Sequence, residues 1–289
     1  MKKTILRVAL VSVAALSVGS PALAEHSWGT YHWSKGTNQL GVTVGDNVDS
    51  RWDQYLVVAL GVDASGNPFE GAKPSWNDSS VIASPLVAGA TDPKRCKAAA
   101  GKIEVCNARY GRTGWLGVAG ISISGGHIVS GYTKVNDTYF DTAKYNTPGW
   151  RRLVMCQEIG HDYGLGHTDE TFANTNHGTC MDYTDDPDGT IKNQLSNEYQ
   201  NAHDFVQLET IYGHSHQATT NFGERKLGAA PAAAEAALEG GNSPADWGRA
   251  VAYDGKGRPH IFEKNEGGRK IITHVFWTLE HKGGGSQDH

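Results

Sequence analysis

The sequence predicts an α+β fold, and three observations support this prediction. Apolar residues alternate with polar residues or glycine over residues 40–44, which is typical of a strand. Two segments, residues 50–61 and 148–161, carry apolar residues at spacings of three and four, which indicates amphipathic helices. Between residues 75 and 140, short apolar runs broken by glycine indicate several further strands.

The first 24 residues are typical of an export signal. A basic start is followed by a short apolar run and by Ala22-Leu23-Ala24, which predicts cleavage before Glu25. Cleavage removes three basic residues and no acidic one, so the formal net charge falls from −5 to −8. This acidity argues against nucleic acid or an anionic membrane as a partner. A secreted protein, periplasmic or extracellular, is expected.

Helix-capping residues mark the two predicted helices. Ser50 is expected to cap the first helix, and Gly61 is expected to end it. The second helix is expected to begin at Thr147-Pro148, because a capping residue followed by proline is typical of a helix start. A third helix is expected within residues 197–213, with its apolar side chains in the core.

Four regions are predicted along the chain. Two strands, residues 114–124 and 127–140, are expected to pair through a glycine turn inside the main domain. The composition changes after His214, where a linker rich in alanine and glycine begins. The predicted boundaries are a signal peptide over 1–24, a catalytic domain over 25–214, a linker over 215–247 and a small β-rich unit over 248–289.

Four cysteines in an exported chain indicate two disulfides. Four cysteines allow three pairings. Cys96 and Cys106 would close a short local loop, which leaves Cys156 for Cys180. The alternative, thiolate metal ligands, usually needs a paired C-x-x-C spacing that this sequence lacks.

The stretch "QEIGHDYGLGH" carries the residues of a metal site. Gln157 and His161 are four apart and face the same side of the predicted helix, so both can contact one ion. Glu158 lies further around the helix, where its carboxylate can reach a metal-bound water without being a ligand. Gly164 can end the helix in a left-handed conformation and bring His167 back to the same ion. Three protein ligands and a water form a catalytic zinc site.

This stretch is similar to the H-E-x-x-H-x-x-G-x-x-H signature of the metzincin zinc peptidases, with glutamine at its first position. The family also has a methionine turn beneath the metal, which Met181 in "GTCMDY" resembles, and Tyr183 stands where some members have a tyrosine that reaches the metal. The resemblance covers about residues 27–214. It implies a zincin fold, with a twisted and mostly parallel sheet, an antiparallel edge strand that binds substrate, a backing helix, the active-site helix below the cleft, and a helical subdomain after Gly164.

The resemblance further implies a secreted zinc-dependent endopeptidase that acts on a peptide or protein substrate, with Zn²⁺ as its cofactor. Glu158 is the expected general base, and Tyr183 is expected to hydrogen-bond the developing oxyanion. A monomer is expected. Gln157, His161 and His167 are the expected metal ligands, and Met181 and Gly164 are expected to have structural roles.

Gln157 leaves three hypotheses open, because an amide oxygen is a weaker zinc donor than imidazole. Its oxygen can replace the missing histidine. Another residue can complete the site, with Asp169, Tyr183 and the more distant His177 as candidates. In the third hypothesis the metal is lost, and the protein is a catalytically silent relative that binds peptides or a protein partner. Another candidate class of function is a structural or adhesive protein that uses the C-terminal strands, but this class leaves the motif unexplained.

Overall fold

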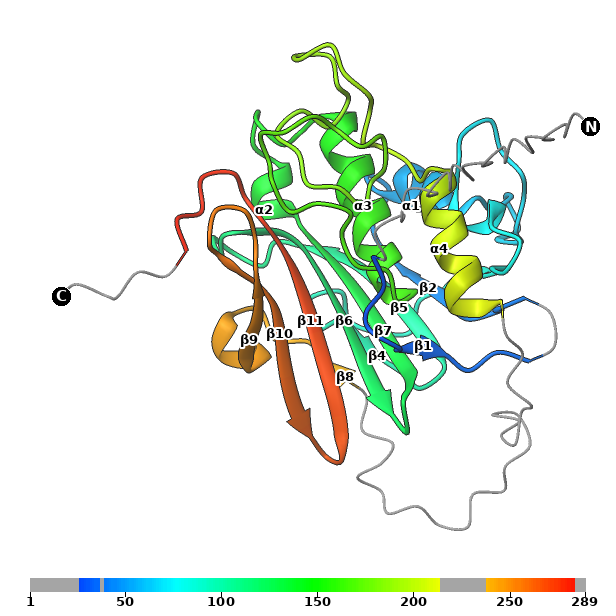
Figure 1. Ribbon diagram of the computed structural model, residues 1–289. Coiled ribbons are helices and arrows are strands. Elements are labelled where there is room, and N and C mark those ends of the chain that lie inside the picture. The colour runs from blue at the N-terminus through cyan, green and yellow to red at the C-terminus, as the bar shows by residue number, and fades with distance from the viewer. Residues whose placement is uncertain (1–25, 37–38, 214–237, 284–289) are drawn as a thin grey trace, which may run out of the picture.

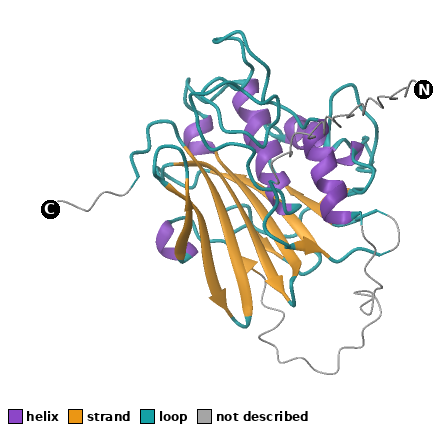
Figure 2. Cartoon of the chain, viewed as in Figure 1, coloured by secondary structure: helices purple, strands orange, loops and turns teal. Residues whose placement is uncertain are grey.

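The computed structural model describes residues 26–36, 39–213 and 238–283, and it has the predicted α+β architecture. One mixed sheet forms one layer, and the longer helices gather on one of its faces (Figures 1 and 2). The signal peptide and most of the predicted linker lie outside the described residues. Among the described residues, no helix is long and apolar enough to cross a lipid bilayer.

One half of the sheet is parallel. Its strands run in the order β3, β2, β5 and β7, and β1 pairs with the start of β7. The strand predicted at residues 40–44 overlaps β2, and β1 is a separate short strand that precedes it. The five strands are β1 (His32–Trp33), β2 (Thr43–Asn47), β3 (Leu86–Ala88), β5 (Lys102–Ala108) and β7 (His127–Asn136).

The other half of the sheet is antiparallel. β6 pairs with β7 through Gly125 and Gly126, which both have positive φ, as the predicted glycine turn requires. β11 then pairs with β6, and β10 and β9 follow toward the far edge. The four strands are β6 (Trp115–Ser124), β9 (Arg249–Tyr253), β10 (Pro259–Glu266) and β11 (Arg269–Trp277).

This half corrects three predictions. The sheet is not mostly parallel, because every pairing beyond β7 is antiparallel. β6 is not an edge strand, because β11 pairs with it from Lys270 to Trp277. The C-terminal strands over 248–289 also do not form a small unit of their own. They continue the main sheet, because the apolar faces of β10 and β11 are buried in the cores on its two sides.

The helices begin and end largely where capping residues predict. α3 (Pro148–Asp162) begins with Thr147 accepting a hydrogen bond from Trp150 N. α1 (Asp53–Leu60) ends at Gly61, which has a φ of 71°, as predicted. The residue at its N-cap position is Trp52, which makes no side-chain cap, so the predicted Ser50 cap is wrong. In the region after Gly164, where a helical subdomain was predicted, the described residues up to 213 form one helix, α4 (Ala202–Tyr212). The shorter elements are α2 (Asp137–Phe140), α5 (Pro244–Trp247), a 3₁₀ turn (Trp76–Asp78), and a two-stranded sheet of β4 (Lys97–Ala98) and β8 (Leu238–Glu239).

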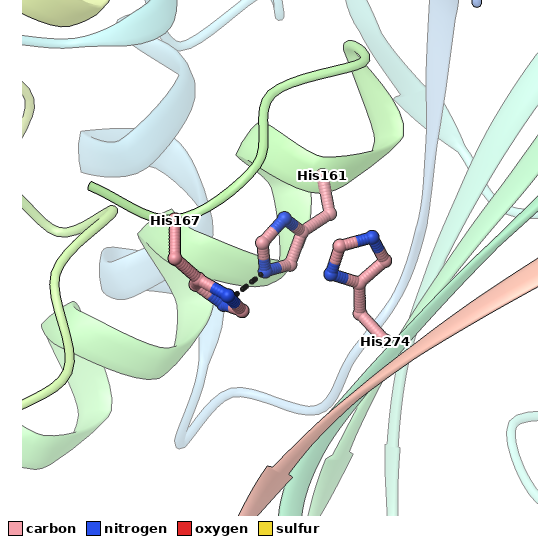
Figure 3. A group of neighbouring side chains, drawn as sticks. All are labelled: His161, His167 and His274. Carbon is pink, nitrogen blue, oxygen red and sulfur yellow. Dashed lines mark hydrogen bonds between the residues drawn. The ribbon is translucent and has the colours of Figure 1, made fainter. Parts of the chain in front are cut away.

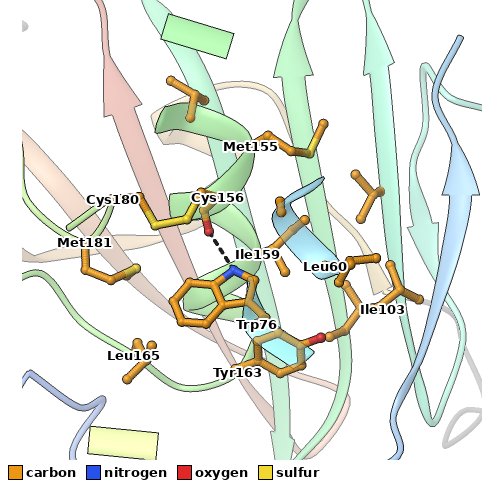
Figure 4. Packing of buried hydrophobic residues seen from close by; sticks show 14 of the residues in the cluster. Leu60, Trp76, Ile103, Met155, Cys156, Ile159, Tyr163, Leu165, Cys180 and Met181 are labelled. Carbon is orange, nitrogen blue, oxygen red and sulfur yellow. Dashed lines mark hydrogen bonds between the residues drawn. A yellow bond between two sulfur atoms is a disulfide. The ribbon is translucent and has the colours of Figure 1, made fainter. Parts of the chain in front are cut away.

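The main core lies between the sheet and the helices. Figure 4 shows Trp76 at its centre, where the indole nitrogen donates to Cys156 O at 3.1 Å and the ring lies near Tyr163. A second cluster covers the opposite face of the sheet, where Trp247 of α5 packs near Phe262 and Trp277. Both faces of the sheet are therefore covered, which explains why the central strands are apolar on both sides.

Both predicted disulfides are present. Cys96 pairs with Cys106 across a sequence separation of 10, and Cys156 pairs with Cys180 across a separation of 24. The second disulfide joins α3 to the turn that carries Met181, so it holds the two motifs of the predicted site together.

Candidate metal centre

Glycines of the sheet face helix α3 where the helix packs against it. A Cβ added at Gly117 of β6 would lie 2.5 Å from Glu158 Oε1, and one added at Gly131 of β7 would lie 2.9 Å from Asp162 Oδ1. Thr133 Oγ1 donates to Asp162 Oδ2 at 2.9 Å. These small residues thus allow Glu158 and Asp162 to contact the sheet directly. The two contacts fix the rotation of α3 about its axis.

The structure brings His161 and His167 together. Gly164 has a φ of 94°, and the chain reverses after it, as predicted. His161 Nε2 and His167 Nε2 lie 2.9 Å apart. Zn–N bonds of about 2.0–2.1 Å place two nitrogens of a tetrahedral site roughly 3.3 Å apart, so one ion can contact both with a small adjustment.

The backbone fixes the proton on His161. Its Nδ1 lies 2.7 Å from Leu165 O, and because a carbonyl only accepts, Nδ1 must carry the proton. The lone pair of the neutral ring is therefore on Nε2, the atom that faces His167. Metal-binding histidines commonly have this arrangement, with the other ring nitrogen donating to a carbonyl.

Met181 packs against α3, and its place in a methionine turn stays a prediction. A Cβ added at Gly160 would lie 2.5 Å from its sulfur, and its carbonyl accepts from Thr168 N at 2.8 Å. Gln157 is fully buried, and its Nε2 donates to Cys180 O of the same turn at 2.6 Å. Gln157 Oε1 makes no hydrogen bond to the described residues, so its role as a metal ligand stays a prediction.

Glu158 and Tyr183 are both closed off from solvent, with 0% and 1% of their surfaces exposed. Burial raises the pKa of Glu158 well above its usual value, and the nearby Asp162 carboxylate raises it further. The backbone of Ala119 in β6 offers the Glu158 carboxylate a hydrogen bond that lowers its pKa, but neither oxygen makes a well-aligned hydrogen bond within the described residues. Tyr183 Oη lies 3.2 Å from Val275 O and 3.3 Å from His260 Nδ1. The phenol therefore faces the C-terminal strands.

The C-terminal strand β11 contributes a third histidine, which sequence reasoning missed. His274 lies opposite Ala119 in the β6–β11 pairing, and its ring stacks on His161 with centroids 3.7 Å apart. Figure 3 shows it approaching His161 from the side opposite to His167. Ligand nitrogens of His161, His167 and His274 all lie within 4.8 Å of one another.

A sequence signal for His274 existed. Ile272, His274 and Phe276 alternate along β11, and both apolar neighbours pack in the core that contains α3. Strand periodicity therefore places His274 on the helix-facing side. The sequence does not indicate which strand β11 pairs with.

The other residues considered as replacement ligands do not converge on the histidines. Asp169 Oδ1 accepts from Thr171 N at 2.5 Å and from Asn174 Nδ2 at 2.9 Å, so it stabilises its own turn. His177 is partly exposed, and its Nδ1 lies 3.1 Å from Thr168 Oγ1. Neither residue belongs to the group of ligand atoms around His161.

The three imidazoles are in the form that binds a metal ion. Burial lowers the pKa of His161 to about 3, and burial together with the neighbouring histidines lowers the pKa values of His167 and His274 well below the usual value. All three rings are neutral at physiological pH, so their nitrogen lone pairs are available. Neutral imidazole nitrogens in a tight group suit Zn²⁺ and other late transition-metal ions.

Comparison with known proteins gives no match, either to a protein-family model or to a curated protein. The metzincin resemblance therefore rests on the two motifs and on the way the fold brings their residues together.

Proposed function

We propose that the protein is a secreted zinc-dependent endopeptidase of the metzincin type, with His161 and His167 as metal ligands and Glu158 as general base. The strongest support is the pair of imidazole nitrogens 2.9 Å apart, with the tautomer of His161 fixed by a carbonyl. Glu158 comes from the same helix and is fully buried, with the Ala119 backbone as its hydrogen-bonding contact. A buried carboxylate with so few hydrogen bonds is costly, which argues against a packing role.

The residues divide the chemistry between them. A zinc ion in such a site would act as a Lewis acid and lower the pKa of a bound water. Glu158 would take the proton of that water and pass it to the leaving amine. The Leu165 carbonyl keeps the lone pair of His161 directed at the ion. Gln157 Oε1, which is buried and unpartnered, is available as a further oxygen donor.

The described conformation leaves no free edge at β6 for a peptide substrate. The resemblance implies an antiparallel edge strand that binds substrate, but β11 pairs with β6 through eight residue pairs from Lys270 to Trp277. Val275 of the same strand lies against the hydroxyl of Tyr183. A peptide substrate would therefore bind β6 only after β11 moves away.

A second candidate function follows from the same pairing. If β11 never leaves β6, the protein is catalytically silent and its buried histidines bind an ion for stability, unlike the silent relative predicted from the sequence, which has lost the metal. The burial of Glu158 against β6 and of Tyr183 against the C-terminal strands favours this candidate.

Metal content and a Glu158→Gln variant test the proposal. Purified protein is expected to contain one zinc per chain and to cleave an unfolded protein substrate, with loss of cleavage on chelation. Glu158→Gln is expected to keep its zinc and to lose about 100-fold or more of the cleavage rate. The control is Glu266→Gln, at the exposed end of β10, which is expected to behave as the wild type.

Three results would decide between the candidates. Zinc binding without cleavage would support the second candidate. Cleavage that survives both chelation and Glu158→Gln would contradict the assigned base. A chain that binds no divalent ion would contradict both candidates and favour the silent relative that has lost the metal.

A further inference from the structure

His274 has no role in the metzincin motif, yet its setting is that of a ligand. It lies on β11, more than 100 residues after His161, and only 2% of its surface is exposed. Neither of its ring nitrogens has a hydrogen-bond partner among the described residues. A neutral imidazole has one N–H donor and one acceptor nitrogen, and leaving both unpaired in the interior is costly.

The surroundings of His274 offer an ion as the simplest partner. Trp28 packs edge-on against the ring with centroids 3.7 Å apart, and the stacked His161 ring covers another side. The ring nitrogens of His161 and His167 lie within 4.8 Å of a His274 nitrogen. No acidic side chain belongs to this group, and neutral imidazole nitrogens can donate their lone pairs to one shared cation.

We propose that His274 completes a three-histidine site for a divalent transition-metal ion together with His161 and His167. This inference rests on the metal binding in the proposed function and adds a ligand from outside the motif. It explains how the site tolerates glutamine at position 157, because the missing imidazole comes from β11. The ion would also cross-link α3 to β11, the C-terminal strand that pairs with β6.

A competing set of ligands shares His167. His167, Glu170 and His260 also have ligand atoms within 4.8 Å of one another. Glu170 is partly exposed, and His260 Nδ1 contacts Tyr183 Oη at 3.3 Å. His260 therefore already has a polar partner, whereas His274 has none. This difference makes His260 the matched control for His274.

Cobalt titration of the full-length protein tests the assignment without relying on activity. Metal-free wild type is expected to bind Co²⁺ and to show the visible absorption of a four-coordinate ion. Zn²⁺ is expected to displace the bound Co²⁺. His274→Ala is expected to bind Co²⁺ about 100-fold more weakly, since even residues that only support a ligand change affinity by about 10–100-fold. His260→Ala is expected to keep the affinity and the spectrum of the wild type.

A His274→Cys variant gives a positive signal that does not depend on loss of binding. All four native cysteines are in disulfides, so the new residue would be the one free thiol. If position 274 contacts the ion, Co²⁺ is expected to show an added sulfur-to-cobalt charge-transfer band in the near ultraviolet. Near-ultraviolet circular dichroism would confirm that each variant is folded.

The outcomes separate this inference from the proposed function. If the wild type binds Co²⁺ and His274→Ala binds it equally well, the inference is overturned while metal binding by the motif stands. The same holds if His260→Ala loses affinity and His274→Ala does not, or if folded His274→Cys shows no charge-transfer band. A wild type that binds neither Co²⁺ nor Zn²⁺ overturns both.

Discussion

The two halves of the sheet are built differently on either side of β7. The parallel half, β1, β2, β3, β5 and β7, lies within residues 32–136, a range that also contains β6. The antiparallel half joins β6 to strands that follow it by more than 120 residues. Both halves support α3, since Thr133 of β7 bonds Asp162 and Gly117 of β6 faces Glu158.

Only the antiparallel half closes the candidate site. β11 brings His274 to the motif histidines, and its backbone carbonyl at Val275 contacts Tyr183. The difference shows that the parallel half positions the helix, whereas the C-terminal strands decide the ligand set and the access to it. Three changes can test this division, from the largest expected effect to the smallest.

A charge in the core face of β11 should destabilise the whole protein. Val275 is fully buried in the cluster on the outer face of the sheet, so Val275→Asp is expected to lower the free energy of unfolding by about 4 kcal/mol or more. Val251→Asp on the edge strand β9, where the side chain is 40% exposed, is expected to change it by about 0.5 kcal/mol or less. Differential scanning calorimetry should show a single transition that shifts as one. Two transitions, of which only one shifts, would mean that the C-terminal strands unfold independently.

The close contact between α3 and β6 should resist a single added methyl group. In Gly117→Ala the new Cβ would meet Glu158 Oε1 at 2.5 Å and Val154 Cγ1 at 2.6 Å, so a loss of about 1–3 kcal/mol is expected from denaturant unfolding. Gly36→Ala adds a methyl group that nothing approaches within 4 Å, and its effect is expected to stay within about 1 kcal/mol. Equal stabilities for the two variants would show that α3 can move away from β6 at little cost.

The smallest effect is a pH dependence from Lys134 of β7. Its side chain is fully buried and donates to Gly240 O and to Asn242 Oδ1, so it holds the segment that leads into the C-terminal strands. Burial lowers the pKa of Lys134 to about 8, whereas nearby carboxylates raise it. The folded state therefore binds fewer protons than the unfolded state between pH 8 and the usual lysine pKa, and stability should rise with pH in that window.

The expected gain from Lys134 is about 1 kcal/mol between pH 8 and pH 9.5, measured by urea unfolding. Lys134→Met keeps much of the side-chain volume without the charge, so the gain should disappear in that variant. A wild type whose stability is flat or falls over this range, with Lys134→Met unchanged, would show that the buried ammonium is not perturbed.

Local chemistry in the sequence determined the elements and part of the site. Thr147 and Pro148 begin α3, and Gly164 reverses the chain, because caps and left-handed glycines act over a few residues. The spacing of His161 and His167 around that glycine was enough to predict that they meet. The β-rich character of residues 248–289 was likewise predicted, and the disulfide partners were predicted from their separations.

The tertiary structure alone decided which strands pair and which faces are covered. Alternation fixes the two faces of β11 but not its neighbour, because any exposed strand edge offers the same backbone hydrogen-bonding groups. The choice of β6 as partner depends on the packing of Ile272 and Phe276 against one core and of Val275 and Trp277 against the other. That choice buried the expected substrate edge and placed His274 beside His161, two consequences that no local pattern contains.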